Sequence, residues 1–583
     1  MVLTYRMRSS ISLALIAVAS LAQASPLNER NNGGQNEEQK GSQPSVKIQN
    51  GTILGVDIPG FDQEAFFGIP YAKPPVGDLR LKPAQPRDTP FGSYQATDPG
   101  AACYSPLAAQ GMDFNAAWNQ SEDCLTLNIV RPYSAKDQSK PLPVAVWIYG
   151  GAFTQGFAGD QRYNGTWLLD AGNANGSPFV YVSINYRLAS LGFSYNKALL
   201  EEGSVNLGIR DQYLALQWVQ ENIAAFGGDP DRVTLFGESA GGASTLFQTL
   251  AYGGRDDNHF HQVIIQSGTL PQQYANVSSP AAVAAYNNLL ANSTCISTMS
   301  DSAAQQLACI RSLPIQTFRQ LTATAPTGFV QDNDFLQSPS SASALNNGAY
   351  IKVPSILGAN TDEGSTFGPR GANSSEDVLR LNNIPESIAN ATLAAYSNDP
   401  KLGCPYNTGD YQLPPTFGPP GTQDKRSQSI YGDIFVDSGR RHLAQLNADA
   451  GVPVYSYRFN HVPWVTVSLP FVQWVSHGSD VPYVFNSQVN RTEEWLKYNL
   501  PMTPLGQGAP IADRALGEYM ARSWAAFIAT GNPNDANYTS GVYWPEYSNG
   551  TQNLVWQTQG SIVEKDDYRK EGIQTIIEGF WSS

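Results

Sequence analysis

The chain has 583 residues, of which 41% are hydrophobic and 11% aromatic, and its formal net charge at pH 7 is −14. This much apolar sequence can build a sizeable core, and the acidic balance argues against nucleic acid or an anionic membrane as a partner. Gly and Pro are scattered, and no internal repeat is visible. Because large α/β enzymes often run long as single units, we expect one large domain rather than several small ones.

The first 24 residues have the pattern of a secretory signal peptide. Arg6 and Arg8 supply the positive start, residues 11–21 are apolar, and residues 22–24 form a small-residue cleavage site. The apolar run is too short to span a bilayer, which takes about 20 residues. We therefore expect a secreted, extracellular protein without a stable membrane anchor.

A polar segment separates this leader from the folded domain. Residues 25–44 are polar and charged and have almost nothing to bury, so we expect disorder there. Order is expected from about Ser45, where Val46 to Ile53 alternates well enough for a strand. Residues 45–583 are predicted to form a single catalytic domain.

Further along, runs of β-branched residues alternate with helical patterns. The runs indicate strands buried on both faces, and the alternation predicts an α/β fold with a large, mostly parallel central sheet covered by helices on both faces. Functional groups in such sheets lie at the C-terminal ends of the strands. The predicted strands are residues 143–149, 179–185, 232–236, 262–266 and 353–357, and the clearest helix is 211–222.

Five cysteines in an oxidising compartment suggest two disulfides and one unpaired thiol. Cys103 with Cys124 and Cys295 with Cys309 are the economical pairs, because each closes a short loop. A loop of that size contributes roughly 3 kcal/mol in the chain-entropy model. Cys404 is the expected odd cysteine, either a buried thiol or an intermolecular link.

Asn-x-Ser/Thr sequons are frequent, which suits a secreted glycoprotein carrying N-linked glycans. Asn175 is doubtful because Pro178 follows its Ser177. The sequons are at Asn50, Asn119, Asn164, Asn175, Asn276, Asn292, Asn373, Asn390, Asn490, Asn537 and Asn549.

The most informative motif is Gly-Glu-Ser-Ala-Gly at residues 237–241, between a predicted strand and a small-residue helix. A turn this tight needs glycine on both sides of Ser239, and it lifts the hydroxyl clear of the sheet. The motif alone is weak, since a glycine-lined packing turn has the same pattern. Ser239 is the candidate nucleophile.

A serine hydroxyl needs a neighbouring base, and the chain has five histidines. In hydrolases with this elbow the acid and then the histidine follow the serine, which disfavours His259 and His261. That His-x-His pair lacks an evident third metal ligand, so we expect no metal. His442 in a basic helix is expected to be solvated, and His461 to be structural. His477, in a polar loop between apolar segments, is the candidate base.

The acid that orients the histidine is expected after a strand. Asp362 and Glu363 follow the strand that ends near Leu357, and the residues alone leave the choice between them open. Asp480 is too close in sequence to His477, and a helix-capping role suits it better.

Negative charge that develops on a tetrahedral intermediate needs fixed N–H donors. Residues 149–153 (Tyr-Gly-Gly-Ala-Phe) follow a predicted buried strand and can offer backbone N–H groups, and Ala240 directly after the nucleophile can offer another. An ordinary turn at Gly150 and Gly151 is the alternative.

Together with these features, several motifs resemble the type-B carboxylesterase and lipase family, which includes cholinesterases and secreted fungal lipases. The likeness runs from about Val46 to Tyr547, and as a set the motifs are very specific. They lie at residues 67–77, 121–128, 185–187, 222–230, 237–241, 361–365, 530–533 and 544–545.

The resemblance implies an α/β-hydrolase fold and a serine hydrolase that acts on carboxylic esters without a metal or organic cofactor. Carried over by position, the nucleophile is Ser239, the acid Glu363 and the base His477. The implied oxyanion donors are Gly151, Ala152 and Ala240. The implied disulfides are Cys103–Cys124 and Cys295–Cys309. The resemblance also implies a structural ion pair between Arg80 and Glu122.

Two departures from the family pattern change the expected specificity. Relatives usually have a third glycine where this chain has Ala152, and the added methyl predicts poor turnover of esters of tertiary alcohols. The loop between Cys103 and Cys124, a lid in family lipases, is short and mixed here, with Met112, Phe114 and Trp118 among polar residues. This argues against strong interfacial activation.

The leading interpretation is a secreted carboxylic-ester hydrolase whose substrate is a small-molecule or lipid ester. A lipase or steryl-ester hydrolase is the alternative within the class, and a catalytically silent adhesion protein is the alternative outside it. Phe153, Phe471 and Trp474 are candidate pocket residues, although core packing explains each equally well. The natural ester and the oligomeric state are not readable from the sequence.

Overall fold

A computed structural model describes residues 43–107, 115–271, 273–398, 421–464, 475–488, 504–535 and 541–582, all within one compact unit, Gln43–Ser583. The predicted signal peptide and nearly all of the predicted disordered segment lie outside the described residues. So do Met112, Phe114, Cys404, Phe471, Trp474, Asn490 and Asn537.

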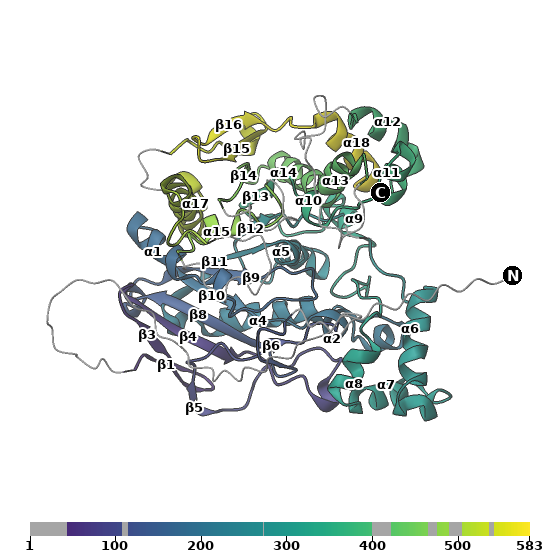
Figure 1. Cartoon of the computed structure of the whole chain (residues 1–583). Coiled ribbons are helices and arrows are strands. Elements are labelled where there is room, and N and C mark those ends of the chain that lie inside the picture. The colour runs from purple at the N-terminus through teal and green to yellow at the C-terminus, as the bar shows by residue number, and fades with distance from the viewer. Residues whose placement is uncertain are drawn as a thin grey trace, which may run out of the picture. The chain divides into compact units, whose positions relative to one another are not determined.

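The core of the unit is an eleven-stranded mixed sheet in the order β16-β15-β14-β13-β12-β11-β9-β10-β8-β4-β3 (Figure 1). The strands from β15 to β10 are parallel, and the pairs at both edges are antiparallel. The strands are β3 (Val56–Ile58), β4 (Gln63–Pro70), β8 (Thr126–Pro132), β9 (Leu142–Ile148), β10 (Val180–Ile184), β11 (Gly228–Glu238), β12 (Gln262–Gln266), β13 (Ser355–Asn360), β14 (Val454–Phe459), β15 (Gln552–Trp556) and β16 (Ile562–Lys565).

The predicted strand over residues 46–53 is wrong in one respect, because it is a hairpin. β1 (Ser45–Ile48) pairs with β2 (Gly51–Leu54), and β2 pairs with β5 (Gly92–Gln95) in a separate three-stranded sheet. Gln49 and Asn50 form the turn, and Gly51 directly after them has a φ of 148°, where a Cβ would stand 2.4 Å from the carbonyl oxygen of Gly92. The apolar positions change phase between Ile48 and Ile53, and Asn50-Gly51 between them is a typical hairpin turn pair, so the sequence does carry a signal for this turn.

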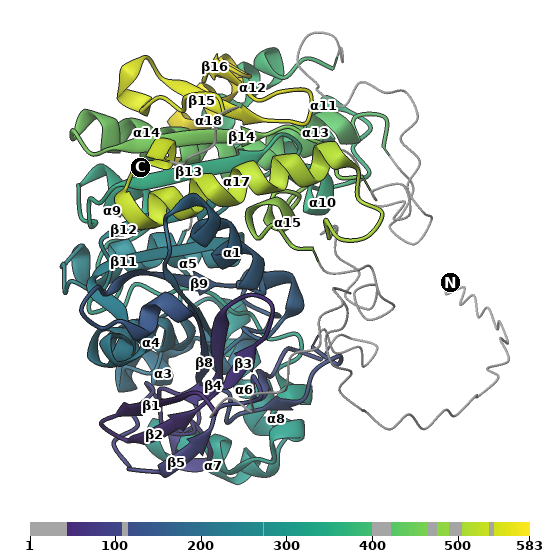
Figure 2. The same cartoon turned by 90° about the vertical axis from the view of Figure 1, so that its left-hand side faces the viewer.

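Helices cover both faces of the large sheet. α17 packs on β9 and β11 and against α1, whereas α5 packs on β11 and β12. Figure 1 shows α1 and α17 on the opposite side of the sheet from α5, and Figure 2 shows α1 and α17 in front of the strands. The α-helices are α1 (Thr166–Asn175), α2 (Ala189–Phe193), α3 (Lys197–Glu202), α4 (Leu207–Asn222), α5 (Ala240–Leu250), α6 (Pro280–Ala291), α7 (Ala303–Ser312), α8 (Ile315–Leu321), α9 (Ser341–Asn346), α10 (Gly364–Phe367), α11 (Ser375–Leu381), α12 (Ala389–Ala395), α13 (Asp424–Gly432), α14 (Ser438–Asp449), α15 (Val481–Val484), α17 (Ile511–Thr530) and α18 (Lys570–Phe580), and the π-helix η9 (Asp433–Asp437) joins α13 to α14.

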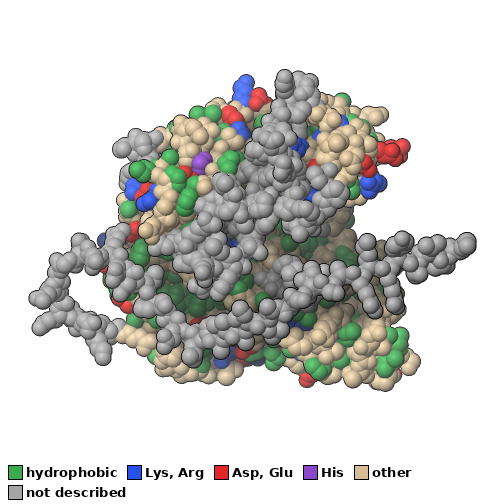
Figure 3. All heavy atoms as spheres, viewed as in Figure 1, with side chains coloured by type: hydrophobic (Ala, Val, Ile, Leu, Met, Phe, Trp, Pro, Cys, Tyr) green, Lys and Arg blue, Asp and Glu red, His purple; other side chains and the backbone are tan. Residues whose placement is uncertain are grey.

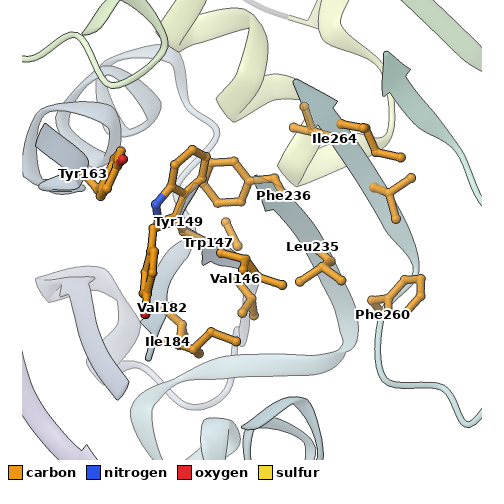
Figure 4. Packing of buried hydrophobic residues seen from close by; sticks show 14 of the residues in the cluster. Val146, Trp147, Tyr149, Tyr163, Val182, Ile184, Leu235, Phe236, Phe260 and Ile264 are labelled. Carbon is orange, nitrogen blue, oxygen red and sulfur yellow. The ribbon is translucent and has the colours of Figure 1, made fainter. Parts of the chain in front are cut away.

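Aromatic packing ties together the strands that lead to the site. The ring of Trp147 on β9 lies 4.8 Å from that of Phe236 on β11 and 5.2 Å from that of Tyr163 (Figure 4). It also lies 4.9 Å from the ring of Phe485, which directly follows α15. The contacts with Phe236 and Phe485 are edge-on and that with Tyr163 is tilted, and such ring contacts favour one fixed arrangement. The core therefore holds the ends of β9 and β11 in register with the segment around α15.

Both disulfides expected from the sequence, Cys103–Cys124 and Cys295–Cys309, are present. Arg80 and Glu122 form the expected ion pair at 2.6 Å, and Arg80 also donates to the carbonyl oxygen of Leu313 at 2.5 Å. This pair is largely buried and ties the cystine loop to the end of α7.

The described surface mixes charges of both signs. Figure 3 shows Lys and Arg side chains near acidic ones on the described part of the face in view.

Asn175 is 1% exposed and donates to Ser177 at 3.0 Å, so its sequon cannot carry a glycan in the folded protein. In the described ranges, every helix falls short of the length and apolar character needed to cross a membrane. The sequon asparagines that are exposed or partly exposed are Asn50, Asn119, Asn164, Asn276, Asn292, Asn373, Asn390 and Asn549.

Candidate active site

Ser239 stands at a sharp corner between β11 and α5. Its φ of 58° and ψ of −124° are strained for a residue with a side chain. A Cβ on Gly241 would stand 1.9 Å from the carbonyl oxygen of Ile148, and one on Gly237 2.4 Å from the carbonyl carbon of Gly241. Only glycine fits at either position, so the chain can turn and leave the Ser239 hydroxyl partly exposed.

His477 links this serine to Glu363. Its Nε2 lies 2.7 Å from the Ser239 hydroxyl, and its Nδ1 lies 2.5 Å from a carboxylate oxygen of Glu363. The His477 side chain is 13% exposed and that of Glu363 is 1% exposed. An imidazole placed in this way can take a proton from the serine while the carboxylate holds the ring in one tautomer.

Glu363, rather than Asp362, faces the histidine. The other oxygen of Glu363 accepts hydrogen bonds from the Ser267 hydroxyl and the amide of Asn360, both at 2.6 Å. Asp362 instead accepts from the amide of Val475 at 3.2 Å. Burial raises the pKa of Asp362 to about 7. One carboxylate thus points at the imidazole, and its neighbour braces the loop that carries it.

Glu238, which sequence reasoning missed, is a second carboxylate beside the histidine. One of its oxygens lies 3.3 Å from Nε2 of His477 and has no hydrogen bond among the described residues. Burial raises the pKa of Glu238 to about 8, against the opposing effect of His477. Burial lowers the pKa of His477, but the negative fields of Glu238 and Glu363 outweigh it and raise that pKa to about 9. The variable position before the serine in a Gly-x-Ser-x-Gly motif carries no sequence signal for such a role.

The loop after β9 approaches the serine closely. A Cβ on Gly150 would stand 2.9 Å from Cβ of Ser239. Gly151, Ala152 and Phe153 all have positive φ, at 109°, 55° and 60°. In the described part of the chain, no acceptor binds the amide N–H of Gly151 or Ala152. Successive left-handed residues form a concave array of N–H groups suited to an anion.

The remaining histidines lie away from this cluster. His261 accepts from the amide of Val233 at 3.2 Å, and His461 lies 2.8 Å from Asp513 in a structural pair. His442 was expected to be solvated, but it is half-buried and lies 2.7 Å from Asn346. His259 packs on Tyr213, and burial lowers its pKa. Among the described residues, no group of three or more His, Cys, Asp and Glu could hold a metal ion.

The predicted capping role of Asp480 is wrong. Asp480 occupies the N-cap position of α15, but its side chain makes no capping hydrogen bond. It accepts instead from Tyr457 at 2.7 Å, Gln266 at 3.0 Å and Asn360 at 3.2 Å. These partners lie on β14, β12 and β13, and they hold the carboxylate in a buried position, where burial raises its pKa. Asp480 thereby anchors the segment that follows His477.

Phe153, a candidate pocket residue, packs with other phenylalanines. Its ring lies 5.1 Å from that of Phe193 and 5.0 Å from that of Phe329. Both partners are almost fully buried. Core packing therefore accounts for most of its contacts, and these contacts fix the end of the loop that carries Gly151 and Ala152.

Ser239 lies at a sharp turn between a central parallel strand and a helix, in a mixed sheet with helices on both faces. This arrangement defines an α/β-hydrolase fold, as the sequence predicted. The crystal structure of Aspergillus niger EstA superposes with a TM-score of 0.76 at 26% identity, covering 93% of this chain and 98% of EstA.

Sequence comparison identifies the family. The Carboxylesterase family matches residues 42–575. Secreted lipase 1 of Botryotinia fuckeliana (strain B05.10) is 32% identical over 93% of this chain and 94% of the lipase, and Lipase 2 of Diutina rugosa is 31% identical over 92% and 96%. The chain belongs to the carboxylesterase family and is a carboxylic-ester hydrolase. The resemblance drawn from the motifs is confirmed.

Proposed function

We propose that the chain is a secreted serine esterase that works through an acyl-enzyme, with Ser239 as nucleophile, His477 as general base and Glu363 as the acid that orients it. The observation that carries this proposal is the continuous hydrogen-bonded path from the Ser239 hydroxyl through both nitrogens of His477 to Glu363.

In the first half-reaction the Ser239 hydroxyl attacks the acyl carbon while its proton moves to Nε2 of His477. The imidazolium then protonates the departing alcohol oxygen. Negative charge on the carbonyl oxygen is met by the N–H groups of Gly151, Ala152 and Ala240, each worth on the order of 10²–10³ in rate. Water attacks the acyl-enzyme by the same path and releases the acid. No metal or organic cofactor takes part in these steps.

The site of action is proposed to be extracellular. The amino-terminal pattern of residues 1–24, the two disulfides and the name of a relative as a secreted lipase support this. N-linked glycans on the accessible sequons belong to the same proposal. Deglycosylation of the secreted protein by an N-glycosidase should lower its apparent mass.

An organophosphorus ester probe tests the mechanism. The probe should label the wild-type protein at Ser239 with loss of esterase activity, and Ser239→Ala should be inactive and unlabelled. Ser312→Ala removes an exposed serine on α7 and serves as the matched control, with labelling and activity retained. Labelling that survives in Ser239→Ala would assign the nucleophile to another residue. A wild-type protein that is neither labelled nor active would favour a non-enzymatic adhesion role.

A lipase or steryl-ester hydrolase is the second candidate, because both relatives described above are named lipases. Rates on esters of increasing acyl length, measured below and above their solubility, separate the two. A soluble-ester hydrolase saturates before droplets form, whereas a lipase gains rate once they do.

A further inference from the structure

Three aromatic side chains, Phe367, Tyr431 and Phe435, form a continuous surface beside the His477 ring, and we call them the aromatic wall. The ring centroid of Phe367 lies 5.7 Å from that of Tyr431 and 5.3 Å from that of Phe435. Tyr431 and Phe435 stack at 5.3 Å with an interplanar angle of 15°. The Phe367 ring meets the His477 ring edge-on, at 4.8 Å and 81°. The wall therefore begins in contact with the proposed base.

Close backbone contacts hold the wall in place. A Cβ on Gly364 would stand 1.9 Å from the carbonyl oxygen of Gln428, and one on Gly432 would stand 2.7 Å from the amide nitrogen of Gly364. Glycine at both positions lets α13 lie directly against α10. The π-helix η9, a form frequent at functional sites, carries Phe435, and its Asp433 is bound by Arg569 at 2.6 Å. The rings are thus presented by a fixed scaffold.

The wall is open rather than buried. Phe367 is 37% exposed, and Tyr431 and Phe435 are partly exposed. Within the described ranges, the Tyr431 hydroxyl has no hydrogen-bond partner. Phe435 packs in part against the main core, but the exposed parts of the three rings remain a contiguous apolar surface. Such a surface marks a binding site more often than isolated exposed residues do.

The order of the strands places the wall on one side of the serine. In the sequence β9-β11-β12-β13, β9 leads into the loop with Gly151, β11 leads to Ser239, and β13 leads to Glu363 and α10. The wall and the two proposed oxyanion donors of the β9 loop, Gly151 and Ala152, are thus on opposite sides of Ser239. Because His477 must protonate the departing oxygen, the alcohol part of the ester lies on the side of the wall.

We infer that the aromatic wall binds the alcohol part of the substrate and selects alcohols that carry a flat aromatic ring, such as benzylic and phenolic alcohols. The inference rests on the proposed function, since it needs His477 to face the leaving group. Aromatic rings gain from offset-stacked and edge-on contacts beyond the area they bury. A saturated ring of the same size is thicker and lacks this electrostatic complementarity.

Two esters with the same acyl group isolate this contact. Benzyl acetate and cyclohexylmethyl acetate both release a primary alcohol and differ in the flat, aromatic character of the ring. Each kcat/KM is divided by the rate of alkaline hydrolysis of the same ester, because benzyl alcohol is the better leaving group. For the wild-type enzyme kcat/KM should favour benzyl acetate by roughly three- to tenfold. Equal values, or a preference for cyclohexylmethyl acetate, would overturn the inference while leaving the proposed mechanism intact.

Variants then assign the preference to the wall. Phe435→Leu and Tyr431→Leu keep an apolar side chain but remove the ring, so the ratio of the two kcat/KM values should fall toward one. Phe61→Leu, whose ring packs on Trp167 at 6.1 Å, is the matched control and should keep the wild-type ratio. A ratio is compared because it does not depend on the fraction of active enzyme, and probe labelling at Ser239 verifies folding.

Tyr431→Phe separates the ring from its hydroxyl. Since the ring remains, the preference for benzyl acetate should persist, and its loss to the extent seen in Tyr431→Leu would overturn ring stacking as the basis of selection. An unchanged ratio in both leucine variants would show that another surface holds the alcohol. If the wild-type protein hydrolyses neither ester and is not labelled by the probe, the proposed function itself fails.

Discussion

Glu238 directly precedes the proposed nucleophile, and its carboxylate lies 3.3 Å from Nε2 of His477. A negative charge at this distance favours the protonated imidazole, and together with Glu363 it raises the pKa of His477 to about 9 after burial has lowered it. A protonated histidine cannot take the proton of Ser239. In the proposed mechanism, Glu238 would therefore stabilise the imidazolium and also limit the pH range in which the reaction starts.

Replacing Glu238 by Gln should move the acid limb of the pH profile. The change removes one of the charges that raise the pKa of His477, so the neutral imidazole persists to lower pH. The acid limb of kcat/KM should shift downward in pH, measured with a soluble ester over pH 5–10. Glu201→Gln, which removes an exposed carboxylate on α3, should leave the limb in place. An unshifted limb in Glu238→Gln would mean that Glu238 carries no charge in the free enzyme.

Ala152 is the other residue whose identity has a direct consequence. Its φ of 55° is unfavourable for alanine and natural for glycine. The methyl group also lies on the loop proposed to bind the oxyanion, where a bulky ester would approach. Ala152→Gly should therefore improve hydrolysis of tert-butyl acetate relative to ethyl acetate, by about tenfold, since one methyl group is worth roughly 10–200-fold in selectivity. Brisk hydrolysis of tert-butyl acetate by the wild-type enzyme would contradict the expected restriction.

At the scale of elements, the cystine loop is tied to the chain that follows the proposed oxyanion loop. Asn115 accepts from the amide of Gly156 at 3.0 Å and donates to its carbonyl oxygen at 3.1 Å. It also donates to the carbonyl oxygen of Cys103 at 3.0 Å, and Trp118 packs on Phe157 at 5.5 Å. The described part of this loop is thus fixed to Gly156 and Phe157, and these contacts would have to break for the loop to move as a lid.

Activity should therefore not rise sharply when substrate forms droplets. The rate on tributyrin, followed through its solubility limit, should saturate as a simple hyperbola. Asn115→Ala removes the three hydrogen bonds and should lower the rate at every concentration, because the loop that carries Gly151 loses its brace. A sudden rise of the wild-type rate at the solubility limit would show that a lid opens despite these contacts.

Much of the central sheet was predictable because β9, β10 and β12 are buried on both faces and have dense β-branched sequences. The hairpin of β1 and β2 was also readable, because Asn50-Gly51 is a hairpin turn pair and the apolar positions change phase across it, but the prediction of one continuous strand overlooked this signal. The order of serine, acid and histidine predicted Ser239 and His477, and the structure brings these two together. The hydrogen-bond partners of Glu363 could not be predicted, because Ser267 and Asn360 reach it only through the register of β12 and β13.

At the scale of the whole molecule, the buried titratable groups make stability and activity change in opposite directions over the same pH range. Burial raises the pKa of Glu238 from 4.5 to about 8 and that of Asp362 from 3.8 to about 7. The unfolded chain releases these protons at lower pH than the folded protein, so stability falls as pH rises through these windows. His477 acts in the same direction, because the stability from its raised pKa is complete below 6.5 and is lost as pH rises through about 9.

On the acid side Asp566 sets the limit. Although burial opposes it, Arg440 and Arg441 hold the pKa of Asp566 far below 3.8, so its contribution is present above 3.8 and is lost at lower pH. The Tm should thus be highest near about pH 5 and decline toward pH 9, while kcat/KM rises because His477 becomes neutral. Differential scanning fluorimetry beside esterase assays in the same buffers measures both. Glu238→Gln should show a shallower decline in Tm, and a wild-type Tm that rises from pH 5 to pH 9 would contradict the assignment of these buried groups.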